Sequence, residues 1–247
     1  MYKSIAKYYD LLGWDEFHDI ALKRLKPLLQ KERVKTYLDL ACGTGMLGCT
    51  VARMGIEVVG LDKSKEMLAM AEERRRLYRL DNRPTFFKRD MSRFSLKRRF
   101  DAVGCFFDAA NHITDPERFA EFIRCAALHT RPGGFFIFDV NTVRGLGKWD
   151  AVLFNNRGQH SVLMKGKYES KSRLAEISIE GFINLANGKR DTFKETFFER
   201  AYLHNDIMRL LRRNGFDRIS AKPQRRENTL RVADRVFYVA YRKEEER

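Results

Sequence analysis

The first part of the chain alternates short apolar runs with segments whose apolar residues recur every three or four positions. Short apolar runs predict strands, and the wider spacing predicts amphipathic helices. The run Phe135–Val140 is apolar throughout, which is typical of a strand buried on both faces. This alternation predicts an α/β fold built on a parallel sheet. The predicted strands are 36–40, 57–61, 85–88, 102–107 and 135–140, and the predicted helices are 15–31, 47–53, one after Ser64 and one that begins at Asp115-Pro116.

The pattern changes after about residue 148. Three β-type runs predict antiparallel strands at 161–168, 175–184 and 192–198. Asn187-Gly188 lies between the last two runs and is a strong hairpin-turn signal. A helix and two strands then follow, at 205–214, 217–221 and 235–242. We therefore expect an α/β domain formed by residues 1–145 and 201–247, with an antiparallel β insert at 146–200 that serves as a lid or substrate platform.

Composition narrows the class of protein. Of the 247 residues, 44% are hydrophobic and 12% are aromatic, which is enough for a large packed core. No apolar stretch approaches the roughly 18 residues of a membrane-spanning helix, and the N-terminal residues show no apolar signal segment. We therefore expect a cytoplasmic protein without a membrane partner.

The net charge of +15 raises the question of a nucleic-acid partner. The basic residues are scattered in short groups and are not interleaved with aromatic residues, as they are in a base-stacking surface. A heavily charged, solvated surface also accounts for this composition. Nucleic-acid binding is therefore the less favoured alternative, and the sequence leaves the oligomeric state open, a homodimer included.

Cysteine and histidine do not form a recognisable metal-binding pattern. Cys42, Cys49, Cys105 and Cys125 include no C-x-x-C pair, and two of them fall in apolar strand patterns. Free buried thiols are therefore expected. The five histidines are dispersed along the chain, so we expect no metal site.

A glycine-rich turn follows the first predicted strand, in the segment Leu38–Gly45. Glycine tolerates positive φ and lets backbone amides approach a ligand closely, and the following helix offers its N-terminal N–H groups. The segment Gly43–Gly48 also matches the dinucleotide fingerprint G-x-G-x-x-G, with Asp62 after the next strand as the ribose acid. The turn alone therefore leaves open a nicotinamide dinucleotide or another nucleotide-like cofactor.

The residues before the turn favour a nucleotide-like cofactor other than a nicotinamide dinucleotide. Asp39 lies four positions before Gly43, an arrangement that resembles motif I of class I S-adenosylmethionine (SAM) methyltransferases. Four further segments resemble that family in the same order: Gly60–Ser64, Arg89-Asp90-Met91, Phe100–Val103 leading into Phe106-Phe107-Asp108, and Arg131–Gly134. The resemblance implies a Rossmann-like seven-stranded methyltransferase sheet with helices on both faces and the antiparallel β insert after strand five.

The resemblance also implies the cofactor site. It places Asp39 near the methionine end of SAM, Asp62 on the ribose hydroxyls, and Asp90 and Met91 beside the adenine. The cofactor-binding residues that we expect are Tyr8, Asp39, Ala41, Gly43, Gly45, Asp62, Lys63, Met67, Asp90, Met91 and Phe106. S-adenosylhomocysteine (SAH) is then the product.

Three shorter segments resemble a small-molecule branch of the family, which includes amino-sugar N-methyltransferase-like enzymes: Tyr8-Tyr9-Asp10, Asp108–His112 and Asp139–Thr142. Asp108, Asn111 and His112 follow the fourth strand, where the transferred methyl group is expected to point, and are the candidate catalytic residues. His112 is the candidate general base because the pKa of histidine is naturally near neutral.

Structural roles compete with several of these assignments. Asp39 can cap the turn that follows its strand, and Asp90 can cap the segment Met91–Leu96. His112 can be a packing histidine, and Tyr8 can anchor the N-terminal arm.

The favoured function is SAM-dependent methyl transfer by in-line displacement to nitrogen or oxygen of a small-molecule acceptor. Methylation of tRNA or rRNA, a non-catalytic nucleotide-binding module and a nicotinamide-dependent dehydrogenase are the alternatives.

Overall fold

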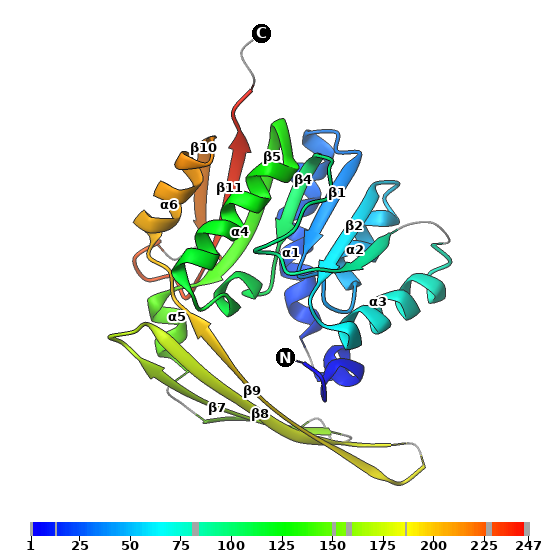
Figure 1. Cartoon of the computed structure of the whole chain (residues 1–247). Coiled ribbons are helices and arrows are strands. Elements are labelled where there is room, and N and C mark those ends of the chain that lie inside the picture. The colour runs from blue at the N-terminus through cyan, green and yellow to red at the C-terminus, as the bar shows by residue number, and fades with distance from the viewer. Residues whose placement is uncertain are drawn as a thin grey trace.

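The computed structural model describes residues 2–12, 14–80, 84–149, 152–156, 160–185, 187–225 and 229–244, which form two β-sheets with flanking helices (Figure 1). The larger sheet has seven strands in the order β10-β11-β5-β4-β1-β2-β3. Its strands are β1 (Thr36–Leu40), β2 (Glu57–Asp62), β3 (Thr85–Lys88), β4 (Phe100–Cys105), β5 (Thr130–Asn141), β10 (Phe216–Pro223) and β11 (Arg235–Arg242).

The strands β5, β4, β1, β2 and β3 are neighbours in this order and run parallel, whereas β11 pairs antiparallel with β5 and β10 pairs antiparallel with β11. The chain adds β2 and β3 on one side of β1 and then returns to place β4 on the other side. In open α/β sheets such a switch in direction leaves a crevice at the carboxyl ends of the two central strands, where ligands bind. The glycine turn follows β1 at this edge.

Helices cover both faces of this sheet because successive strand residues point to opposite sides. Tyr37 packs in one core cluster with Leu25 of α1 and Val51 of α2. Its neighbour Leu38 packs in the other cluster with Phe122 of α4. The long helices are α1 (Asp15–Lys31), α2 (Met46–Ala52), α3 (Lys65–Leu77), α4 (Pro116–His129) and α6 (His204–Arg213). None of the helices in the described residues is long and apolar enough to span a membrane.

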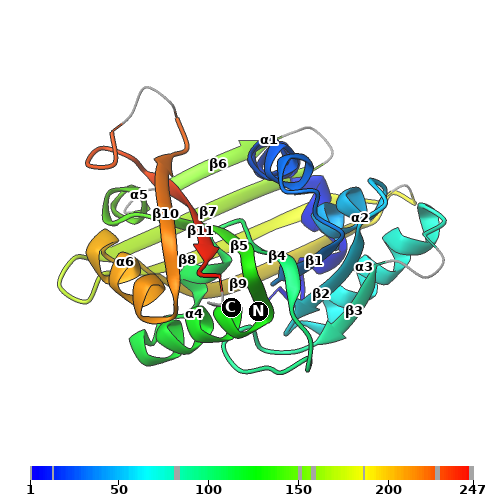
Figure 2. The ribbon, with the colours of Figure 1, turned by 90° about the horizontal axis from the view of Figure 1, so that it is seen from above.

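The smaller sheet is antiparallel and lies across the carboxyl ends of the parallel strands, beneath them in Figure 1 and crossing under them in Figure 2. Its strands are β6 (Val152–Asn156), β7 (His160–Glu169), β8 (Leu174–Asn184) and β9 (Arg190–Arg200). The 3-10 helix η1 (Ala6–Leu12) lies between the two sheets, and its Leu12 packs with the preceding Ile5 in one cluster with Ile177 and Phe197. The site edge of the large sheet is therefore covered by a second layer.

This architecture confirms the predicted fold class, with some differences in detail. Strand β4 ends at Cys105, earlier than predicted, because Phe107 and Asp108 take left-handed backbone conformations with φ of 62° and 50°. Helix α5 (Val143–Gly147), β6 and the two 3-10 helices, η1 and η2 (Ala109–His112), were not predicted. Such short elements carry too few residues to show a hydrophobic period. The four-stranded sheet falls within residues 146–200, while the division into domain segments stays a prediction.

Candidate active site

The glycine turn is held by the carboxylate of Asp62 at the end of β2. Its Oδ2 accepts a hydrogen bond from the backbone N–H of Gly43 at 3.0 Å, and its Oδ1 accepts one from Ser64 at 2.8 Å. The hydroxyl of Ser64 in turn caps α3 by accepting from Met67 at 3.2 Å. One side chain therefore fixes both the loop after β1 and the start of α3.

The same turn needs glycine for two different reasons. Gly43 and Gly45 have φ of 55° and 72°, a region that other residues adopt at a cost. A Cβ on Gly43 would meet no atom within 4 Å, whereas one on Gly45 would lie 2.8 Å from the Cβ of Ala71 and 2.9 Å from Phe86. Gly45 therefore serves the packing of the turn against α3 and β3, and it is not among the residues that line the cavity.

Asp39 is the buried acid of the predicted motif and is only 3% exposed. Its Oδ1 is 3.4 Å from the Tyr37 hydroxyl, and its Oδ2 has no hydrogen-bond partner among the described residues. Burial raises the pKa of Asp39 to about 7, because desolvation disfavours the ionised form. The protein therefore keeps an unsatisfied acceptor close to the turn.

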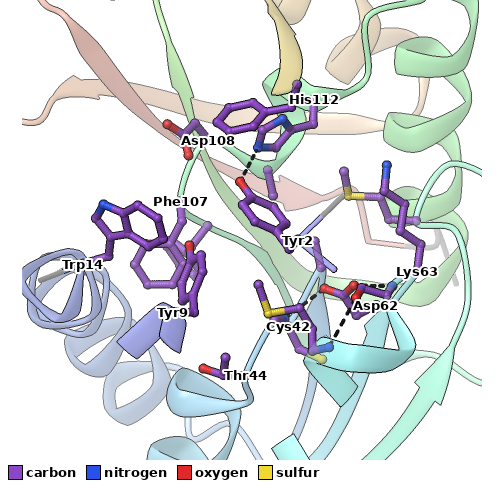
Figure 3. Close-up of a pocket in the computed structure, with 18 of the residues that line it drawn as sticks. Tyr2, Tyr9, Trp14, Cys42, Thr44, Asp62, Lys63, Phe107, Asp108 and His112 are labelled. Atoms are coloured by element: carbon purple, nitrogen blue, oxygen red, sulfur yellow. Dashed lines mark hydrogen bonds between the residues drawn. The ribbon is translucent and has the colours of Figure 1, made fainter. Parts of the chain in front are cut away.

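A cavity of about 410 Å³ opens at this edge (Figure 3). The predicted cofactor residues on its wall are Ala41, Gly43, Asp62, Lys63, Met67, Asp90, Met91 and Phe106. Two of the three candidate catalytic residues, Asp108 and His112, also line it. Tyr8, Asp39, Gly45 and Asn111 do not.

The N-terminal segment closes one side of the cavity. Tyr2, Tyr9 and Trp14 point into it, and Asp10 accepts a hydrogen bond from Thr44 of the glycine turn at 2.9 Å and pairs with Arg74 of α3. Of the neighbours Tyr8 and Tyr9, only Tyr9 lines the cavity.

Tyr8 was predicted to bind the cofactor, but its place away from the cavity wall gives that prediction no support. Tyr8 is buried in the cluster between η1 and the four-stranded sheet, and its hydroxyl donates to Asp191 of β9 at 2.5 Å. Adjacent residues of a 3-10 helix point in different directions, so only one of the two tyrosines faces the cavity.

The turn after β4 is held by Asp139 of β5. The carboxylate of Asp139 accepts hydrogen bonds from the backbone N–H groups of Phe107, at 2.8 Å, and Asp108, at 3.0 Å. These contacts stabilise the left-handed turn that carries Asp108 and His112 to the cavity. Phe106 is buried at the start of the turn and Phe107 is half-buried.

His112 lies on the cavity wall and meets the N-terminal segment, with its Nε2 3.1 Å from the hydroxyl of Tyr2 (Figure 3). Burial lowers the pKa of His112 to about 4, although nearby Asp108 opposes the shift. The imidazole is therefore neutral at neutral pH. The ring of Phe197 from β9 packs edge-on against it at a centroid distance of 5.1 Å.

Asn111 is fully buried and has a structural task. Its amide nitrogen donates to the carbonyls of Asn141, at 3.0 Å, and Arg200, at 2.8 Å, and its Oδ1 accepts from the N–H of Asn141 at 2.8 Å. All of its polar atoms are used to tie η2 to the ends of β5 and β9. These contacts give Asn111 a structural role, and it does not line the cavity, so nothing in the geometry supports its predicted catalytic role.

Asp90 lines the cavity and also caps the segment that follows it, so both roles predicted for this residue are compatible. Its Oδ1 accepts from the N–H of Ser92 at 2.9 Å and from the Ser92 hydroxyl at 2.7 Å, and its Oδ2 pairs with Arg118 of α4. These hydrogen bonds help to hold the pKa of Asp90 below its usual value, against the opposing effect of burial. The carboxylate is thus ionised and held in place at the cavity wall.

A buried group of charges lies where β5, β9 and β11 meet the turn after β4. Arg235 donates to Asp139 at 2.5 Å and to Asp108 at 2.8 Å. Glu199 of β9 is 2% exposed and accepts from the amide of Asn141 at 3.1 Å.

The structure also gathers residues that the sequence left apart. One ligand atom each from Asp108, His112 and Glu199 lies within 4.8 Å of the others, which is close enough to hold a metal ion. The sequence showed no such cluster because Glu199 is 87 residues from His112 and belongs to no motif. Tyr2, Trp14, Glu199 and Arg235 were likewise missed as wall residues, and their only signal is polar or aromatic character within otherwise ordinary elements.

Comparisons with known proteins agree with this geometry. A family model described as a methyltransferase domain matches residues 38–134. A ubiquinone biosynthesis O-methyltransferase of Proteus mirabilis (strain HI4320) is 33% identical over 199 residues, which cover 75% of this chain and 76% of the relative.

Two crystal structures share the fold over almost the whole chain. A SAM-dependent methyltransferase from Clostridium acetobutylicum ATCC 824 superposes with a TM-score of 0.82 at 23% identity and covers 98% of this chain and 99% of its own. A sugar N-methyltransferase from Streptoalloteichus sp. ATCC 53650 has a TM-score of 0.75 at 21% identity and covers 96% and 93%. From these matches and the site together, the chain belongs to the class I SAM-dependent methyltransferase family.

Proposed function

We propose that the protein transfers the methyl group of SAM to nitrogen or oxygen of a small molecule that binds between the glycine turn and the four-stranded sheet. The observation that carries the proposal is that one cavity wall joins Gly43 and Asp62 to Phe197 and Glu199 of β9. One side suits a nucleoside, and the other side suits an acceptor. An O-methyltransferase of ubiquinone biosynthesis and a sugar N-methyltransferase among the similar proteins support a small acceptor.

The residues on the first side fit SAM. Asp62 presents a fixed carboxylate for ribose hydroxyls, and the positive-φ glycine Gly43 leaves its Cα open to a ligand. Asp90 and Met91 line the cavity and suit the adenine. Asp39 lies off the cavity wall, and we keep its buried, unpartnered Oδ2 as the proposed attraction for the cationic amino group of SAM. Lys63 and Met67 are the neighbouring contacts in this proposal.

The residues on the second side suit an acceptor and the exclusion of water. SAM supplies a methyl group already activated by its sulfonium, so the protein has to align the acceptor, keep water out and remove a proton. Tyr2, Tyr9 and Trp14 cover the cavity from the N-terminal segment (Figure 3). Phe197 and Trp149 line it from the region of the insert.

We assign proton removal to His112. Its lowered pKa keeps the ring neutral at pH 7, and it contacts the Tyr2 hydroxyl through Nε2, so a proton from the acceptor has a path to an unprotonated nitrogen. Asp108 is placed to hold the acceptor beside it, and Asn111 positions the short helix that carries both.

Titration of SAH into the purified protein tests the cofactor side. We expect Asp62→Asn to weaken SAH binding roughly tenfold or more, because a charge-assisted hydrogen bond is worth about 1.5–3 kcal/mol. The matched control is Glu73→Gln, which removes an exposed carboxylate of α3 that does not line the cavity. Absence of SAH binding to the wild-type protein would contradict the proposal.

Acceptor assays separate this function from the alternatives. Release of SAH is measured with small amines, small alcohols and bulk tRNA as acceptors. Turnover of tRNA that falls steeply with salt, with none of the small molecules, would favour RNA methylation and would give the net charge of +15 a role. Binding of SAM without turnover of any acceptor would favour the non-catalytic module. A cytoplasmic location and a homodimer stay predictions.

A further inference from the structure

The charged group between the two sheets holds more negative charge than its one arginine balances. It contains three carboxylates, Asp108, Asp139 and Glu199, and one guanidinium, Arg235. Asp139 and Glu199 are 1% and 2% exposed, and Arg235 is 9% exposed. With every group ionised, three negative charges against one positive charge leave an excess of two.

The hydrogen bonds show which carboxylates remain uncompensated. Asp139 receives Arg235 and two backbone N–H groups, which satisfies it. Asp108 shares Arg235 and takes one hydrogen bond at 2.7 Å from the amide of Asn141. Glu199 has that neutral amide as its donor, at 3.1 Å. The unmatched charge therefore lies on Asp108 and Glu199.

These two carboxylates face the acceptor side of the cavity. Both line it, and one oxygen of each lies within 4.8 Å of the other and of a ring nitrogen of His112. The walls around them are aromatic: Tyr2, Tyr9 and Trp14 lie on the same cavity (Figure 3), and Phe197 lines it as well. A carboxylate pair inside an aromatic enclosure is suited to an organic cation, which gains from the charges and from the ring faces.

Burial of charge requires a partner, and an isolated buried carboxylate takes up a proton instead. Burial and nearby Asp108 raise the pKa of Glu199 well above its usual value, because both disfavour the ionised carboxylate in the empty site. A bound cation reverses this preference. A neutral hydroxyl brings no charge and leaves the excess in place.

We propose that Glu199 and Asp108 bind the amino group of the methyl acceptor as an ammonium ion, and that Glu199 selects an amine over a hydroxyl. This inference rests on the proposed function and names its acceptor class. The ammonium gives one proton to the ionised Glu199 carboxylate or to His112. The freed nitrogen lone pair forms the N–CH₃ bond while the C–S bond breaks and its electron pair returns to sulfur, which leaves an N-methylated ammonium ion and SAH.

The experiment measures binding to the SAH complex, so that the cofactor and acceptor halves of the argument fail separately. Benzylamine and cyclohexylamine are titrated beside their hydroxyl counterparts, benzyl alcohol and cyclohexanol, with each ligand at pH 8. We expect at least one amine to bind roughly tenfold or more tightly than its alcohol, since hydrogen bonds to charged groups are worth about tenfold each. Failure of SAH to bind contradicts the proposed function, whereas SAH binding without an amine preference overturns this inference alone.

Substitution of Glu199 tests whether this residue causes the preference for an amine over an alcohol. Glu199→Gln is expected to abolish the amine preference while leaving SAH affinity unchanged, and Glu176→Gln, an exposed carboxylate on neighbouring β8, is expected to change neither. An amine preference that survives in Glu199→Gln overturns the assignment. SAH affinity serves as the check of folding, and Asp108→Asn replaces Glu199→Gln if the latter does not fold.

A metal ion is the competing source of positive charge. MnCl₂ is therefore titrated into the SAH complex without any amine. Tight, stoichiometric binding of Mn²⁺ that is lost in Glu199→Gln would assign the excess charge to a divalent cation held by Asp108, His112 and Glu199, and would overturn the amine proposal. We expect no such binding.

Discussion

Replacement of Asp39 by asparagine tests two things separately: how much stability the buried carboxylate costs the folded protein, and whether that carboxylate contributes to SAH binding. The substitution keeps the shape of the side chain and removes its charge. Asp39 is almost fully buried, its Oδ2 lacks a donor among the described residues, and its pKa is raised from 3.8 to about 7. A carboxylate in such a place lowers the stability of the empty protein whenever it is ionised.

The pKa shift of Asp39 determines how strongly its ionisation changes the stability of the folded protein, and in which direction. A rise of about 3 pKa units corresponds to roughly 4 kcal/mol, since one unit is worth 1.36 kcal/mol. Because the folded pKa is the higher one, this stability is present below pH 3.8 and is lost progressively as the pH rises to about 7. An asparagine does not titrate, but its buried amide costs about 1–3 kcal/mol if it stays unpaired.

Asp39→Asn is therefore expected to be more stable than the wild type at pH 8 and less stable at pH 4. A net gain of about 1–3 kcal/mol at pH 8 corresponds to a rise in Tm of several degrees, at about 2–4 °C per kcal/mol for a chain of this size. Thermal unfolding of the cofactor-free proteins at both pH values measures it, with Glu73→Gln as control. An equal difference at the two pH values would refute the reasoning, and weaker SAH binding by the variant would show what the acid is kept for.

Three further substitutions test the packing of the site. Gly45→Ala is expected to lower Tm by several degrees more than Gly43→Ala, because both positions have positive φ but only the new Cβ at 45 collides with Ala71; parallel thermal melts measure the difference. Asn111→Ala removes three buried hydrogen bonds and is expected to cost about 2–4 kcal/mol in urea unfolding, with a smaller change in SAH affinity. Arg235→Met is expected to lower the free energy of unfolding by about 3–5 kcal/mol, because it leaves the buried carboxylate of Asp139 without its ion-pair partner. Addition of Asp139→Asn should recover part of that free energy in the same unfolding assay.

Much of the fold follows from local sequence patterns. Most strands of the parallel sheet are short apolar runs, and the caps at Ser64 and Asp115 are local signals, so these positions agree with the structure to within a few residues. Strand β5 differs, because it begins at Thr130, before its predicted start at residue 135. The acid at the end of β2 and the glycine turn after β1 are also local features. They lie together because carboxyl ends of neighbouring parallel strands meet at one edge of the sheet.

The acceptor side was not readable in the same way. Glu199, Arg235 and Trp14 belong to three elements far apart in the chain, and none of them forms a motif. Tyr8 and Tyr9 are neighbours of the same type, yet only the second lines the cavity, because the direction of each ring depends on how η1 packs against the smaller sheet.

The sequence by itself thus determined the α/β class, the order of the strands along the chain and the cofactor edge, since hydrophobic period, turn residues and strand-end acids act over a few residues. The tertiary structure alone decided which polar groups lose their water. The four-stranded sheet covers the turn after β4. As a result Asn111 is fully buried, the pKa of His112 is lowered, and the carboxylate of Glu199 lies close to that of Asp108. Desolvation and charge pairing depend on distances between remote segments, and those distances are set only when the chain has folded.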